Sequence, residues 1–181
     1  MNLKVKIFLC SIILFTFINT ASGIIELGKT KAPDFSLFDL DKKIVRLSQK
    51  RFKNRIIILN FFVTWLPPCR LEIPGFVKLY KAYRSKGVFF LGICLDINDI
   101  DKIKEFVKKY KINYPVLIGS REVVVDYGGI EVIPTTFIIN HNKIITDKIV
   151  GYANEEDLKK RINKLIKIRK NQEKEKEKKK K

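Results

Sequence analysis

The sequence is poor in the residues that usually indicate a metal centre or a disulfide-bonded scaffold. Its 181 residues include 3 Cys and 1 His. Three cysteines are too few for a disulfide framework, and one His beside them argues against a zinc site, which usually needs four such ligands. Neither a glycine-rich phosphate loop nor a C-x-x-C-H haem attachment occurs, so we expect no metal and no cofactor. Only 9 Gly and 6 Pro exclude a collagen-like or linker-like chain, and 46% hydrophobic residues exclude wholesale disorder.

Acidic residues are also scarce, because 37 Lys and Arg stand against 19 Asp and Glu. Residues 169–181 hold eight basic and three acidic residues and no apolar one, which predicts a basic low-complexity tail, either a frayed helix end or disordered. Such a tail would attract an anionic membrane surface. The remaining positive charge is either a composition bias spread over solvated faces or a further attraction for anionic lipid or acidic polymer. No clustered aromatic and basic pattern indicates a nucleic-acid partner.

The amino-terminal segment has the pattern of a secretory signal peptide over residues 1–23. Lys4 and Lys6 precede an apolar run at residues 7–18, and small residues follow at Ala21 and Gly23. Cleavage is expected after Gly23 or Ala21. The alternative is a retained membrane anchor, although 12 apolar residues fall short of the ~20 that span a bilayer. Both alternatives place the rest of the chain outside the cytoplasm, in the periplasm or cell envelope.

Residues 24–168 form one domain with an alternating β/α pattern. A nearly continuous apolar run at residues 55–63 is typical of a strand that is covered on both faces. The order of elements is that of a thioredoxin fold, an α/β fold whose central mixed sheet is flanked by helices, with an amino-terminal β-hairpin and a central α/β insert added. Strands are expected at residues 35–40, 44–47, 55–63, 88–96, 135–140 and 144–150. Helices are expected at residues 68–83, from a cap at Asn98 or Asp99 to residue 110, from a cap at Ser120 to residue 127, and after the cap Asn154.

The segment FFVTWLPPCRLEIP, residues 61–74, resembles the active-site motif of the TlpA/ResA-like branch of the thioredoxin superfamily, W-C-x-P-C-x-x-E-x-P. Residues 32–35, 110–116 and 133–137 match further family segments in the right order, as does Gly151, so the likeness covers residues 32–168. The resemblance implies a redoxin outside the cytoplasm that works as a thiol–disulfide oxidoreductase. Its substrates would be thiols and disulfides of proteins or peptides, and its role would be in cell redox homeostasis.

One departure concerns the nucleophile, because Leu66 stands where the family has its first cysteine. In a working member, that thiolate attacks a substrate disulfide, and the second cysteine then releases the product. Leu66 does neither, and Cys69 matches the second, more buried position. A two-electron cycle within this motif is therefore impossible, and Cys69 is either a silent relic or a slow monothiol. Cys94 is a second candidate redox thiol, against the alternative of a buried apolar side chain.

The resemblance also implies the other site residues. Glu72 matches a glutamate that tunes thiol protonation, with a solvated helix glutamate as the alternative. Trp65 matches a residue that covers the site, with core packing as the alternative, and Pro68 lies inside the motif. Pro134 matches a cis-proline whose neighbouring backbone pairs with substrate. The substrate-binding residues expected on this basis are Trp65, Pro68, Ile133, Pro134 and Thr135.

Two functions of different classes follow from the sequence. The first is an exported member of the oxidoreductase family that is impaired as a disulfide reductase. The second is a binding module, in which the groove between Trp65 and Pro134 holds a peptide or protein partner without chemistry. His141 is expected to be a turn residue of the hairpin and to take no part in either function.

Overall fold

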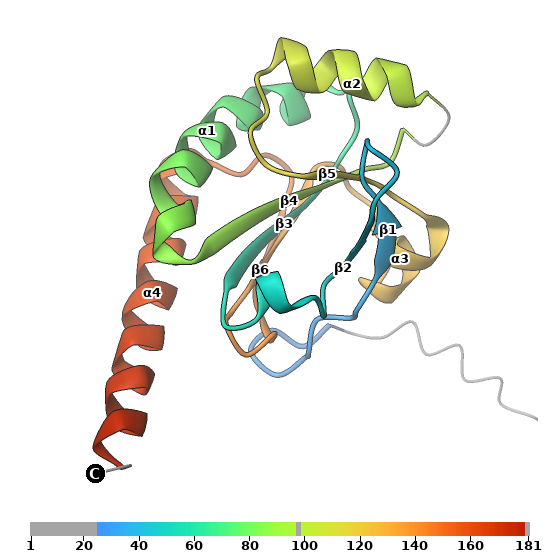
Figure 1. The fold of residues 1–181 in the computed structure, drawn as a ribbon. Coiled ribbons are helices and arrows are strands. Elements are labelled where there is room, and N and C mark those ends of the chain that lie inside the picture. The colour runs from blue at the N-terminus through green and yellow to red at the C-terminus, as the bar shows by residue number, and fades with distance from the viewer. Residues whose placement is uncertain (1–24, 97–98, 180–181) are drawn as a thin grey trace, which may run out of the picture.

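A five-stranded mixed sheet forms the centre of the protein in a computed structural model that describes residues 25–96 and 99–179 (Figure 1). Its strands are β3 (Ile56–Phe62), β4 (Val88–Cys94), β5 (Val116–Ile118), β6 (Thr135–Ile139) and β7 (Ile145–Val150). They lie in the order β5-β4-β3-β6-β7. The β3–β4 and β4–β5 pairs are parallel, and the β3–β6 and β6–β7 pairs are antiparallel. The sheet therefore confirms the expected thioredoxin fold.

The remaining elements also follow the expected order, apart from β5, for which no strand was predicted. A separate antiparallel hairpin pairs β1 (Ser36–Phe38) with β2 (Ile44–Arg46). The helices are α1 (Pro67–Tyr83), α2 (Ile100–Lys109), α3 (Arg121–Asp126) and α4 (Glu155–Lys178), with short 3-10 turns η1 (Lys50–Phe52) and η2 (Arg84–Lys86). Asp99, Ser120 and Asn154 accept backbone N–H groups at the starts of α2, α3 and α4. These three caps explain why the helices begin where the sequence indicates.

Two apolar clusters cover the two faces of the sheet. On one face, α1 and α4 pack with α2 over side chains such as Ile58, Phe90 and Ile138. On the other face, the β1–β2 hairpin and α3 pack over side chains such as Ile57 and Phe137. All seven residues of β3 are buried, because this strand lies in the middle of the sheet and is covered on both faces.

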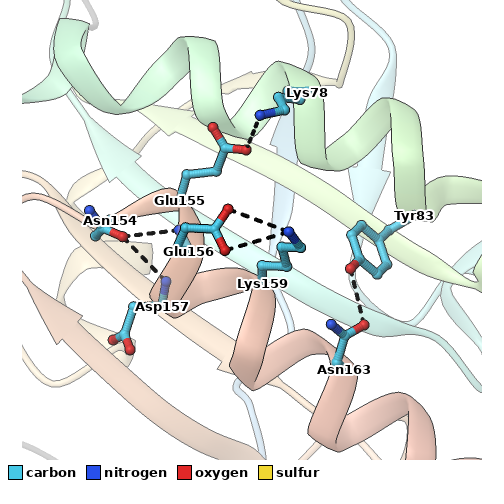
Figure 2. A network of polar contacts seen from close by, with 8 residues as sticks. All are labelled: Lys78, Tyr83, Asn154, Glu155, Glu156, Asp157, Lys159 and Asn163. Atoms are coloured by element: carbon cyan, nitrogen blue, oxygen red, sulfur yellow. Dashed lines mark hydrogen bonds and ion pairs between the residues drawn. The ribbon is translucent and has the colours of Figure 1, made fainter.

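Polar contacts hold α4 against α1 at its amino-terminal end (Figure 2). The Lys78 ammonium lies 2.7 Å from the Glu155 carboxylate, and the Tyr83 hydroxyl donates to Asn163 Oδ1 at 3.0 Å. Asn154 Oδ1 accepts the Glu156 N–H at 3.0 Å and caps the helix. The Lys78–Glu155 pair is solvent-exposed at Lys78 and contributes little energy, so buried apolar residues such as Leu158 and Ile162 supply most of the docking.

The segment 169–181, predicted to be a frayed helix end or a disordered tail, begins with a buried residue. Helix α4 continues without a break to Lys178, and Arg169 is only 8% exposed. Its guanidinium donates to the carbonyl oxygens of Lys86 at 2.6 Å, Gly87 at 3.2 Å and Asn54 at 3.4 Å. A buried charged donor that satisfies several loop carbonyls couples this part of the helix to the body of the fold.

His141 adds a second contact to the same region. It lies in the turn between β6 and β7, as expected, but it is buried and its Nε2 lies 2.8 Å from Gln172 Oε1. The hairpin therefore contacts the first part of the predicted tail. The boundary drawn between residues 168 and 169 does not mark a structural break.

The predicted signal segment, residues 1–23, lies outside the described residues. Within residues 25–96 and 99–179, no helix combines the length and the apolar character needed to cross a membrane.

We predict that Arg169→Ala lowers the free energy of unfolding by about 1–3 kcal/mol, because buried carbonyl groups lose a charged donor. Lys170→Ala is the matched control, since Lys170 is the next residue of α4 and is exposed; it should change stability by less than ~0.5 kcal/mol. Urea denaturation measures both values. Equal losses in the two variants would show that the Arg169 contacts do not stabilise the fold.

Candidate active site

The site begins with a polar residue in the middle of β3. Asn60 is 2% exposed, and its side-chain N–H₂ donates to Glu72 Oε1 at 2.8 Å and to Thr136 Oγ1 at 3.0 Å. These bonds join β3 to α1 and β6 beneath the motif. Sequence reasoning missed Asn60, although a single amide inside the apolar run of residues 55–63 was the signal that could have revealed it.

The segment between β3 and α1 places Trp65 and Leu66 at the carboxyl end of the parallel strands. Trp65 is 57% exposed, which rules out core packing, whereas Leu66 is half-buried and packs against the core beside α1. Leu66 is the N-cap of α1, with Pro67 and Pro68 in the first two helical positions. Proline has no N–H. The start of α1 therefore lacks two of the backbone donors that would stabilise a thiolate there.

Cys69 is fully buried in the first turn of α1. Burial is the main cause that raises the pKa of its thiol to about 11; the Val63 backbone lowers this pKa, and the Glu72 and Asp96 carboxylates add smaller raising effects. A thiol with this pKa is almost entirely protonated at neutral pH, and the protonated form is a poor nucleophile. The structure thus places Cys69 in an environment that opposes both steps of thiol exchange.

Glu72 lies one turn further along α1 and is 2% exposed, so it is not a solvated helix residue. Its Oε1 accepts from Asn60 and its Oε2 from the Ala153 N–H at 3.1 Å. Burial raises the pKa of this carboxyl to about 7, against smaller lowering effects of the two hydrogen bonds. Glu72 therefore changes its protonation state in the neutral range and lies near enough to Cys69 to influence the thiol.

Cys94 lies at the end of β4, where its Cα is paired with Phe62 of β3. It is fully buried in the same apolar cluster as Cys69, and both thiols are free. Burial raises the pKa of the Cys94 thiol to about 12. Asp96, which sequence reasoning missed, follows β4, and its Oδ2 accepts the Thr64 N–H at 2.6 Å. The two cysteines are buried in the same apolar cluster, and the raised pKa of each thiol keeps it protonated at neutral pH.

The loop before β6 completes the site. The Ile133–Pro134 peptide bond is cis, and the Pro134 carbonyl accepts the Gly151 N–H at 2.8 Å. Thr135, the next residue, pairs with Phe61 near the end of β3, and its hydroxyl donates to the Val132 carbonyl at 2.6 Å. The loop is thus fixed beside the strand that leads into α1. No group of three or more His, Cys, Asp or Glu side chains suited to a metal ion occurs among the described residues.

Comparisons with known proteins agree with this geometry. Residues 29–148 match the AhpC/TSA family. The chain belongs to that family. Within it, the relatives are ResA-like: the thiol-disulfide oxidoreductase ResA of Bacillus thuringiensis subsp. konkukian is 33% identical over 164 residues, which cover 89% of this chain and 92% of the relative. ResA of Bacillus cereus is 35% identical over 140 residues, covering 77% and 79%.

Solved structures support the same assignment to a TlpA/ResA-like family with the thioredoxin fold. A thiol:disulfide interchange protein of Chlorobium tepidum TLS superposes with a TM-score of 0.69 at 33% identity, covering 76% of this chain and 96% of that one. StoA of Bacillus subtilis superposes with a TM-score of 0.60 at 27% identity, covering 71% and 96%.

We predict that the stability of the protein falls as pH rises from about 4.5 to 7, because of Glu72. The unfolded chain releases this proton near pH 4.3, whereas the native state retains it up to about pH 7. The raised native pKa makes the unfolded state bind fewer protons over this interval, so the loss is about 3 kcal/mol at most. Urea denaturation at a series of pH values measures the slope.

Glu72→Gln should remove this slope whatever its absolute stability, because the amide does not titrate. Glu105→Gln on the exposed surface of α2 is the control and should keep it. A Glu72→Gln variant with the wild-type slope would show that another group causes the pH dependence.

Proposed function

We propose that this chain is an exported thioredoxin-fold protein of the TlpA/ResA-like family that is impaired as a disulfide reductase. The observation that carries the proposal is the N-cap of α1, where Leu66 occupies the place of the nucleophilic cysteine while the thiol of Cys69 is fully buried. Disulfide reduction in this family uses two thiols in the motif, and this chain has one, that of Cys69.

Reduction of a substrate disulfide needs two thiols in the enzyme. The first forms a mixed disulfide and releases one substrate thiol; the second then displaces the other substrate thiol and closes an internal disulfide. With one thiol in the motif, this chain stops at the mixed disulfide, and an outside thiol must resolve it. The raised pKa of Cys69 makes even the first step slow.

Export is the second part of the proposal. It rests on the charged, apolar and small-residue pattern of residues 1–23, read as a signal peptide or an anchor. In an extracytoplasmic compartment the partners would be thiols and disulfides of other proteins or peptides. The basic carboxyl-terminal residues would add attraction to an anionic membrane.

A second candidate function is a binding module that uses the same groove without chemistry. Trp65, Val132 and Tyr152 are 57%, 47% and 48% exposed, and they lie close in sequence to the end of β3, the start of β6 and the end of β7, which meet at one end of the sheet. The backbone N–H and C=O of Ile133 have no hydrogen-bond partner among the described residues. An extended peptide could pair with these groups as an added strand while Trp65 covers it.

We predict that Leu66→Cys creates a working pair on this scaffold. The oxidised variant should form a disulfide between residue 66 and Cys69, detected by mass spectrometry, and should reduce a model disulfide in the presence of dithiothreitol. Wild type should show almost no turnover. Because Pro67 and Pro68 supply no N–H, the pKa of the new thiol should fall only slightly below the ~8.5 of a free cysteine.

Leu66→Ser and the double variant Leu66→Cys/Cys69→Ser are the controls, since neither has two thiols in the motif, and both should stay inactive. Alkylation of native wild type at pH 7 should be at least ~100-fold slower than that of the unfolded chain, given the raised pKa of Cys69. Wild-type turnover, or a folded Leu66→Cys variant that remains inert, would contradict the proposed function.

The groove has a built-in reporter, because Trp65 is the only tryptophan of the sequence. We predict that a binding peptide shifts the emission of Trp65 to shorter wavelength, since docking removes the exposed indole from water. Tyr152→Ala should weaken the binding, and Leu27→Ala, an exposed apolar residue of the amino-terminal segment, should leave it unchanged. Peptides that alter no emission over a broad library would argue against the binding function.

A further inference from the structure

A strongly basic surface lies at the end of the sheet opposite the motif. Two depressions meet there around Lys53, with volumes of about 550 and 540 Å³. The first is lined by the turns that precede β3 and β4 and by α4; the second includes Lys143, in the hairpin turn between β6 and β7. The positive residues that line the two are Lys31, Lys50, Lys53, Arg55, Lys86, Lys143, Arg169 and Lys170.

The acidic residues of this surface do not balance that charge. Only Asp34 and Glu173 line the depressions. Asp34 already accepts the backbone N–H groups of Phe35 and Ser48, and Glu173 accepts from the Asn54 side chain. Within residues 25–96 and 99–179, no carboxylate lies within 4.0 Å of the exposed lysines Lys50, Lys53, Lys86 and Lys170. The surface therefore carries a positive field that an outside polyanion would neutralise.

The amino-terminal segment of the chain joins the domain next to this surface. Ile25, the first described residue, packs against the apolar cluster that the β1–β2 hairpin and α3 cover. The Gly28 N–H donates to the Ile145 carbonyl at 2.7 Å. The 24 residues before Ile25, with their apolar run at residues 7–18, thus join the domain at the start of β7, next to the second depression. Helix α4 ends on the same side of the molecule (Figure 1).

The motif lies at the other end. Leu66 and Cys69 follow the carboxyl end of β3, whereas Lys53 and Lys86 precede the starts of β3 and β4. Helix α2 also lies at the motif end, where Phe106 stacks on Phe62 at 6.0 Å between ring centroids. Figure 1 shows α2 at the top of the view and the turn between β6 and β7 at the bottom.

We propose that Lys31, Lys50, Lys53, Lys86, Lys143 and Lys170, here called the basic end, lie against an anionic lipid bilayer and hold the motif on the side that faces away from the lipid. Charge complementarity and the point where the apolar amino-terminal segment joins the domain both favour a bilayer as the occupant. The proposal goes beyond the thiol chemistry and holds whether or not the groove reacts.

The test is lysine labelling of the full chain in two kinds of vesicle, phosphatidylcholine alone and phosphatidylcholine mixed with phosphatidylglycerol. A water-soluble amine-reactive ester marks accessible lysines, and mass spectrometry reads each one. In the anionic vesicles, Lys53, Lys86 and Lys170 should be labelled several-fold less than in the neutral ones. The protection should disappear at about 1 M salt, where the Debye length is about 3 Å.

Lys102 and Lys108 on α2 are the internal controls, because they are exposed lysines at the motif end; their labelling should be the same in both vesicles. Lys53→Glu/Lys86→Glu should abolish the protection of Lys170, and the matched variant Lys102→Glu/Lys108→Glu should preserve it. Equal protection of both ends, or of neither, overturns the proposal. Soluble polyphosphate that protects the basic end as well as anionic vesicles at equal phosphate concentration would also overturn it, in favour of a soluble polyanion.

Discussion

The pairing of β3 on both of its edges is the constraint on which the rest of the structure depends. The strand is parallel to β4 and antiparallel to β6. The motif, Cys94 and the Pro134 loop therefore lie at its carboxyl end, and the turns that carry Lys53 and Lys86 lie at its amino end. The one polar residue of the buried strand fixes its register, because a slip would take Asn60 away from Glu72 and Thr136 and leave buried polar groups without partners. The two ends of the molecule are therefore set apart by the same hydrogen-bonded ladder.

Beneath the motif, desolvation is the dominant electrostatic effect. It raises the pKa of Cys69, Cys94, Glu72 and Tyr114, so every one of these groups is favoured in its neutral form. Such burial suits a pair of thiols, because the outer thiol attacks the substrate disulfide at the surface. The inner thiol stays protonated until it resolves the mixed disulfide. In the proposed function the outer thiol is absent, so the same burial keeps Cys69 protonated and out of contact with a substrate disulfide.

Local signals in the sequence predicted much of the fold. The caps Asp99, Ser120 and Asn154, and the apolar run that became β3, act over a few residues and can be read directly. Of the motif residues, Cys69 is buried, as the resemblance implied, and Trp65 is exposed, which excludes the alternative of core packing. What could not be read depends on contacts between distant segments. Arg169 looks like part of a charged tail until the loops before β3 and β4 are seen to offer it carbonyl groups. β5 is three residues long, and only its pairing with β4 identifies it.

The reach of Arg169 bears on the order in which the domain assembles. Its guanidinium joins carbonyl groups that lie 82 to 115 residues earlier in the chain. Contacts of such separation close long loops, and the carbonyl groups lie in the turns that lead into β3 and β4, so the β3–β4 pair must place them before Arg169 can bind them. While the sheet is forming, the turns before β3 and β4 must therefore remain hydrated. We expect the docking of the second half of α4 to be the closing step, one that fastens both turns together and expels their water.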